Sequence, residues 1–348
     1  MRKFLTDLQG VGSRVIPEKG KRKAFLIYIS ISVAIVLGLL ILTFVLSGEA
    51  RDKALGTIVK GLLWGGVYAL IALGVVVVYK ASRVFNLAHG GILLFLTYFL
   101  WWLLHEAGVP TPAALTMVAL AAVLIGLGID RFLMRPMIGE SGLITFIMTL
   151  VLGFSVIQGI TVIVFTGKSE VMPDIFPSGV LTVGKITFGY ELVFAFIMAT
   201  VMFLAFVSYF KYTRGGLAMR CVSEDNIISQ SLGIDVKRIY AIAWVVGCLS
   251  AAMGGMLLSS LTALYSGGGG IGGFAIMRAL PVLLLGGLES IPGAYFGALI
   301  IGLTERVTSV YIEPFVPGFT SVLPYVLMVV ILLIRPHGLF GLKRIERI

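Results

Sequence analysis

Polar residues interrupt an otherwise apolar segment at FNLAHGG (85–91). Asn86 and His89 are three residues apart, so on a helix they would share one face. With Gly90 and Gly91 they could line a transport path or fix a bend at its mouth. Alternatively, both side chains could cap a helix near the membrane surface and bond main-chain carbonyls. The pattern leaves both interpretations open.

Glu305 and Arg306 are adjacent ionisable residues in another apolar run. Ionisable side chains inside a membrane generally face the protein interior and find a partner. Neighbouring residues on a helix point about 100° apart, so these two need not pair with each other. Glu305 could carry protons, but packing or a subunit contact is the favoured interpretation. Lys60 and Arg278 could snorkel to the surface or neutralise an internal acid.

The polar segment 211–238 reads KYTRGGLAMRCVSEDNIISQSLGIDVKR. Ser223 is expected to cap a short helix that starts at Glu224 and Asp225, and Gly233 is expected to end it. The segment therefore predicts a short helix between two longer apolar ones.

Catalytic motifs are missing from the sequence. It contains no hydrolase triad, no zinc motif and no G-x-x-x-x-G-K-[ST] phosphate-binding loop. Cys221 and Cys248 have no metal-ligand spacing, and His89, His105 and His337 are far apart. We expect no cofactor in this chain, so any ATPase must belong to another subunit.

The composition identifies the environment of the chain. Of the 348 residues, 58% are hydrophobic and 13% are charged, which is too little polar surface for a soluble domain of this size. Continuous apolar runs, rather than alternation, favour helices over a β-barrel. The net charge of +10 is explained by basic loops on the cytoplasmic side, and no nucleic-acid partner is expected.

The apolar runs predict an all-α polytopic membrane protein with about ten transmembrane helices. The first run, 24–46, follows a basic tail and is expected to stay as an extra helix, because a cleaved secretory signal has a shorter apolar core. Residues 1–50 thus form a tail plus one helix, 51–341 the main transmembrane domain, and 342–348 a basic C-terminal tail. The ten predicted spans are 24–46, 55–79, 84–104, 112–134, 142–166, 190–210, 238–263, 271–288, 293–312 and 319–335.

The distribution of basic residues predicts the orientation. If both termini are cytoplasmic, 20 of the 27 Lys and Arg residues fall on the inner side, four on the outer side and three within spans. This bias supports an N-in and C-in topology. Under it, 211–238 is a cytoplasmic loop.

Two features suggest inverted repeats. AVLIGLGIDR (122–131) resembles ALIIGLTER (298–306) with one gap, and the two would run in opposite directions across the membrane. Chance similarity between apolar helices is the alternative. The runs that open at 85–91 and extend over 266–287 also look interrupted, which marks Gly286 and Gly287 as a second candidate part of the path.

Several segments resemble the permease subunits of bacterial ABC importers for branched-chain and other hydrophobic amino acids, a family that includes urea and short-amide importers. They cover most of 55–341 and occur in the family's order: GLLWGGVYALIALGVVVVYKASRVFNLAHGGI (61–92), RPMIGESGLITFIMTLVLG (135–153), RGGLAMRCVSEDNIISQSLGIDVKRIYAIAW (214–244), LGGLESIPGAYFGALIIGLTERV (285–307) and LLIRPHGLFG (332–341).

The resemblance implies an importer in the bacterial inner membrane with two permeases, two cytoplasmic ATPases and an external binding protein. SIPGA (290–294) and the AMR that ends at Arg220 are similar to the shorter, H-type permease, whose partner is a sister subunit. The loop aligns with the segment that couples to the ATPase, and Glu224, Asp225 and Gly233 match its pattern.

The chain departs from the family pattern in its extra residues 1–50 and at Glu289, where the family more often has glycine. Pairing with an identical copy therefore stays open. Three other functions are also open: an ion-coupled secondary transporter using Glu305 or His89, a passive facilitator, and an intramembrane enzyme, for which the nucleophile and base are missing.

Overall fold

The computed structural model describes residues 49–165, 168–173, 175, 179–184, 186–224, 226–265 and 270–341. The predicted span 24–46 and both terminal tails lie outside the described residues. The chain divides into two units between Leu55 and Gly56, and the contacts discussed belong to the second unit.

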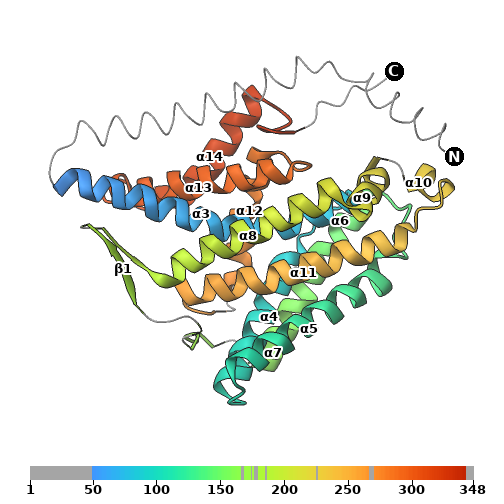
Figure 1. The fold of residues 1–348 in the computed structure, drawn as a ribbon, viewed down its shortest axis with the longest axis horizontal. Helices are drawn as coiled ribbons and strands as arrows, with labels where there is room; N and C mark the ends of the chain where they lie inside the picture. Colours follow the sequence, from blue (N-terminus) through green and yellow to red (C-terminus); the bar gives the residue numbers. More distant parts are fainter. Residues whose placement is uncertain are drawn as a thin grey trace. The chain divides into compact units, whose positions relative to one another are not determined.

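The long apolar runs form long helices (Figure 1). Six spans within the described residues are long and apolar enough to cross a membrane. The π-helical segment η1 (Asp130–Met134) continues α5, and η2 (Leu152–Ile157) joins α6 to α7. The helices that make up these spans are α3 (Glu49–Ser82), α4 (Ala88–His105), α5 (Thr111–Ile129), α6 (Gly142–Val151), α7 (Gln158–Phe165), α8 (Tyr190–Tyr212) and α11 (Val236–Leu261).

Two further predicted spans form a bent pair. Helix α12 (Gly270–Gly286) meets α13 (Ile291–Tyr311) at 119°, as in a broken span or a re-entrant loop. Helix α14 (Phe319–Ile334) is apolar but shorter than the six. Counting the bent pair as one span gives up to seven in the described residues. The count of ten, the orientation and the inverted repeats therefore stay predictions.

Helices α3, α4 and α11 form the centre of the unit. Most of each span is buried, whereas only 28% of the α5 span and 17% of the α6–α7 and α8 spans are buried. The outer helices present large apolar side chains such as Leu124 and Ile163, as lipid-facing helices do. The helical, polytopic architecture that the composition predicts is confirmed.

Glycines allow the central helices to approach each other closely. A Cβ on Gly302 of α13 would lie 2.5 Å from the main-chain nitrogen of Gly65 in α3, and one on Gly90 of α4 would lie 2.5 Å from the oxygen of Gly272 in α12. Side chains would push these backbones apart, so the glycines act at helix contacts.

The described residues also include one small sheet, which leaves the all-α prediction standing. Strands β1 (Val180–Val183) and β2 (Ile186–Gly189) pair antiparallel in a hairpin before α8. Alternating threonine and apolar residues favour this short pairing. The helical class is unchanged.

Candidate functional site

The polar segment between α8 and α11 folds as two short helices. They are α9 (Arg214–Glu224) and α10 (Asn226–Ser231). The expected capping role of Ser223 is wrong, because α9 begins at Arg214 and includes the serine. Thr213 Oγ1 accepts from the Gly216 main-chain nitrogen at 3.0 Å at the start of α9. Ser223 lies inside the helix and donates from its hydroxyl to the Arg220 oxygen at 2.9 Å, as serine does within helices.

Gly233 ends α10, as predicted. Its φ is +81°, its main-chain nitrogen donates to Gln230, and that of Ile234 donates to Ser229. This pair of bonds is the Schellman motif, in which glycine is favoured because it adopts a left-handed conformation. Asp225 lies outside the described residues.

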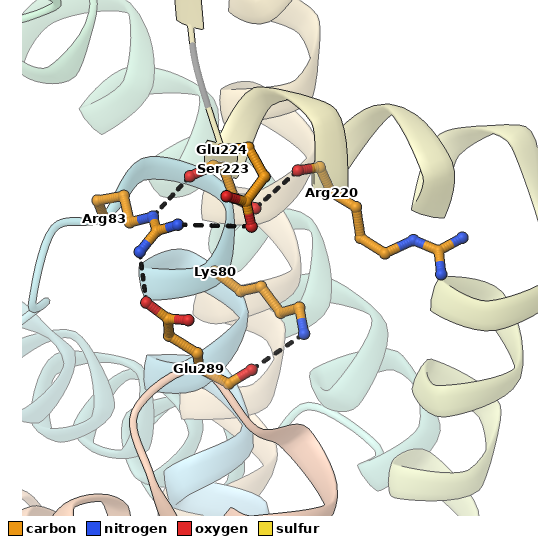
Figure 2. A network of polar contacts seen from close by, with 6 residues as sticks. All are labelled: Lys80, Arg83, Arg220, Ser223, Glu224 and Glu289. Carbon is orange, nitrogen blue, oxygen red and sulfur yellow. Dashed lines mark hydrogen bonds and ion pairs between the residues drawn. The ribbon is translucent and has the colours of Figure 1, made fainter. Parts of the chain in front are cut away.

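Arg83 connects this segment to two other parts of the protein (Figure 2). It follows the end of α3 with a φ of +60°. Its Nε donates to the main-chain oxygen of Ser223 at 2.6 Å, and its guanidinium pairs with the Glu289 carboxylate. A third contact, to Glu224 at 3.8 Å, reaches a side chain that is 75% exposed, so it contributes little. The bonds to Ser223 and Glu289 are half-buried and hold the ends of three elements together.

Lys80 and Arg220 complete the junction shown in Figure 2. Lys80 donates to the main-chain oxygen of Glu289 at 3.0 Å. Its ammonium and the Arg220 guanidinium lie 4.3 Å and 5.6 Å from the ring centre of Phe210 in α8, positions suited to cation–π attraction. A cavity of about 140 Å³ lies between these residues and Tyr79.

Gly286 and Gly287 lie at the bend between α12 and α13. A Cβ on Gly286 would lie 2.2 Å from the Gly293 oxygen, and Gly287 has a φ of +98°. The main-chain nitrogens of Leu339 and Phe340 donate to the oxygens of Leu285 and Gly286. Both glycines therefore permit a tight bend closed by the C-terminal segment, and their place in a transport path stays a prediction.

Asn86 and His89 do not share a helical face, because Asn86 precedes the first turn of α4. Both are buried, and neither Asn86 Oδ1 nor either ring nitrogen of His89 has a hydrogen-bond partner among the described residues. A Cβ on Gly74 would lie 2.4 Å from the His89 ring, and one on Gly91 2.4 Å from the Gly153 oxygen. The group sits in close packing between helices, so a role in a path stays a prediction.

A second polar cluster lies within the apolar helices. Glu305 of α13 accepts a hydrogen bond from Tyr68 of α3 at 2.7 Å and pairs with Arg278 of α12 at 2.6 Å. Arg278 thus neutralises an internal acid, one of the two roles considered for it. Glu305 does not pair with its neighbour Arg306, which agrees with the helical geometry.

Sequence reasoning missed Arg83, Tyr68 and the partner of Glu289. Arg83 was visible only as one basic residue in a short polar segment. Its partners lie far away in the sequence, so no local pattern identifies them. Among the described residues, no three His, Cys, Asp or Glu side chains come together as a metal site.

The two ends of the central helices have different contacts. Arg83, Ser223 and Glu289 meet at one end. In the second half of α4, Tyr98 donates to the Lys168 oxygen at 2.8 Å. Just beyond the C-terminal end of α11, Leu264 forms a β-bridge with Glu170.

The fold is that of a multi-pass helical membrane protein, and the strings of its central helices identify its class. The family model described as "Branched-chain amino acid transport system / permease component" matches residues 57–332. The chain belongs to this family of permeases. Its place is the bacterial inner membrane, and the match leaves out its first 56 residues.

Curated relatives agree. The chain is 28% identical over 304 residues to the high-affinity branched-chain amino acid transport system permease protein BraD of Pseudomonas aeruginosa, covering 84% of this chain and 97% of that protein. It is 29% identical over 305 residues to LivH of Escherichia coli K12, covering 83% and 96%. These are permeases of the H type, as the resemblance implies. PsaBC from Streptococcus pneumoniae in complex with Fab is similar at 15% identity and a TM-score of 0.40, covering 78% of this chain and 89% of that one.

Proposed function

We propose that this chain is one transmembrane subunit of an ATP-driven importer that moves branched-chain amino acids inward by alternating access. The substrate class is supported by the transport systems named for the family and its relatives. The chain's own task is to form part of the path and to change shape. It binds no ATP or other cofactor in this proposal.

The proposed assembly contains a second permease, two cytoplasmic ATPases and an external binding protein. Both termini and the α9–α10 loop face the cytoplasm. The basic residues at the Arg83 end of the helices support this orientation. The binding protein selects the substrate, so the permease itself can bind it weakly.

Exposed apolar side chains support docking of an ATPase on the loop. Leu217 of α9, Ile228 of α10 and Leu232 just after it are 55%, 59% and 65% exposed. Apolar side chains on a short amphipathic segment are typical of a helix that lies in a partner's groove. Arg220, Ser223, Glu224, Asp225 and Gly233 are the proposed coupling residues.

The contacts of Arg83 with Ser223 and Glu289 are the observation that supports the mechanism. A displacement of α9 acts on Ser223, and Arg83 passes it to the end of α3 and, through Glu289, to the α12–α13 bend. Because α3 and α12 pack on α4, the movement reaches the segment with Asn86, His89, Gly90 and Gly91. In this proposal ATP-driven closure of the ATPases moves these contacts, and hydrolysis resets them.

The experiment is uptake of radiolabelled leucine into vesicles that contain the complete assembly. We expect uptake that requires the binding protein, both permeases and ATP on the side of the membrane where the ATPases lie. An assembly with a hydrolysis-dead ATPase is the control. Uptake by this chain alone, driven by a proton gradient or by no energy source, would contradict the proposal.

A further inference from the structure

A cavity of about 160 Å³ lies between α3, α12, α13 and the start of α14. Its walls include Trp64, Tyr68 and Phe274, and its polar lining includes Glu305 and Arg306. An engineered cavity of about 150 Å³ is enough to hold benzene. The space therefore suits a small molecule with a short apolar side chain.

The charges around this cavity do not balance. The Glu305 carboxylate is already paired with Arg278 and bonded by Tyr68. Arg306 forms no ion pair within the described residues, and its buried Nε has no hydrogen-bond partner there. Lys60 lies one helical turn before Trp64 on α3 and so on the same face. An uncompensated cation inside a membrane protein is unfavourable, so the cavity favours an anionic group.

Glu313, near the C-terminal end of α13, already has hydrogen-bond partners of its own. Glu313 accepts from the main-chain nitrogens of Gly318 and Thr320 at 2.7 Å and 2.8 Å, and also from the Thr320 hydroxyl. These bonds hold the start of α14 at the rim of the cavity. Glu313 is half-buried, and its carboxylate forms no ion pair with Arg306 among the described residues.

The cavity lies far from the Arg83 junction. Arg306 is 15 residues beyond Ile291, which opens α13 beside that junction, so it lies about 22 Å along the helix. In the proposed topology this half of the protein faces the external side, where the binding protein delivers substrate.

We propose that this cavity is a substrate subsite in which Arg306 binds the carboxylate of the amino acid while Trp64 and Phe274 contact its aliphatic side chain. The inference rests on the proposed function and locates one substrate contact within it. Tyr68, Glu305 and Arg278 are positioning residues, because their bonds fix α3, α12 and α13 around the space. A planar guanidinium with unused donors matches a carboxylate in both charge and geometry.

The test uses the assembled permeases and ATPases in vesicles, without the binding protein, and a diazirine analogue of leucine that cross-links on illumination. Labelling is expected on peptides that contain Trp64 or Phe274, and excess leucine should prevent it. Leucinamide lacks the carboxylate and should compete about tenfold less well. Arg306→Gln should lower labelling about tenfold, Arg306→Lys should retain part of it, and the exposed control Arg131→Gln should match the wild type.

Labelling that is unchanged in Arg306→Gln, or leucinamide that competes as well as leucine, would overturn the subsite. So would mass spectrometry that finds an anionic phospholipid held at Arg306 in place of leucine. If Arg306→Gln does not assemble, the Lys variant and the leucinamide competition still decide the question. ATP-dependent leucine uptake by the complete wild-type assembly is measured in parallel. Uptake without labelling rejects only the subsite, whereas missing uptake rejects the proposed function.

Discussion

Arg83 and Ser223 are 140 positions apart in the sequence, yet Nε of Arg83 donates to the main-chain oxygen of Ser223 at 2.6 Å. The same guanidinium pairs with Glu289. The end of a central helix, the end of a loop helix and the bend between two others therefore share one cationic side chain. A movement of any one of them changes the contacts of the other two.

Replacing Arg83 should uncouple ATP hydrolysis from transport. Arg83→Gln removes charge-assisted bonds that typically contribute about 1.5–3 kcal/mol each, so we expect leucine uptake to fall about tenfold or more. Basal ATPase activity should persist. Uptake and ATP hydrolysis measured on the same vesicles give the coupling ratio. Arg83→Lys keeps the charge and should lose less, whereas normal coupling in Arg83→Gln would reject the relay.

Charge reversal in the loop should block transport without unfolding the protein. The double variant Glu224→Lys and Asp225→Lys places two cations on the proposed ATPase-docking segment. We expect uptake to be abolished, whereas membrane insertion and the stability of the protein in detergent should stay normal. Membrane fractionation checks insertion, and size-exclusion chromatography checks that the protein stays folded. Wild-type uptake would remove the coupling assignment.

The Glu305 ion pair should matter for stability. Glu305→Gln leaves the Arg278 guanidinium buried without its carboxylate, and loss of one partner of a buried pair typically costs about 3–5 kcal/mol. We expect a lower melting temperature in detergent. Adding Arg278→Met removes the stranded charge and should restore much of the loss. An unchanged melting temperature for Glu305→Gln alone would show that the pair is not stabilising.

Two glycines with opposite surroundings test the close approach of α3 and α13. A Cβ on Gly302 would lie 2.5 Å from the Gly65 nitrogen, whereas one on Gly128 in α5 meets nothing within 4 Å. Gly302→Ala should therefore destabilise the protein by about 1–3 kcal/mol through overpacking. Gly128→Ala should stabilise it slightly through helix propensity. Thermal unfolding of the two variants side by side gives the comparison, and equal melting temperatures would contradict it.

The start of α14 should respond to acid. Hydrogen bonds from the Thr320 hydroxyl and from the Thr320 and Gly318 main-chain nitrogens lower the pKa of Glu313. A carboxyl with a lowered pKa contributes stability that is present above its ordinary pKa and is lost as the pH falls through the lowered value. Amide exchange at Gly318 and Thr320 should therefore speed up in acid beyond the intrinsic pH effect. Glu313→Gln should show no such pH-dependent step, and a wild type that behaves like Glu313→Gln would contradict the assignment.

Most helix positions could be predicted from the sequence because apolar runs of about 20 residues have few alternatives. The predicted run 190–210 became α8, Tyr190–Tyr212, and 238–263 became α11, Val236–Leu261. Where local signals compete, prediction failed. Ser223 looks like a helix cap, but Thr213 provides an earlier start and the helix continues through the serine.

The contacts of Arg83 were harder to predict because they are non-local. The partners of Arg83 lie on α9 and beyond α12, and only the packing of the central helices brings them together. The predicted shared face of Asn86 and His89 was wrong for a different reason. The three-residue spacing to His89 assumes a helix at both positions, but α4 begins only at Ala88. The His89 ring and the Asn86 side chain are both buried, but His89 lies in the helix and Asn86 lies before it.

The order in which the chain is made gives the α12–α13 bend a further consequence. The oxygens of Leu285 and Gly286, at the end of α12, accept bonds from Leu339 and Phe340, and helix ends leave such carbonyls unpaired unless something supplies a donor. The ribosome adds those donors about fifty residues after the bend itself. The bend is therefore completed only after almost the whole polypeptide has been made, and a nascent protein truncated before 339 lacks both donors.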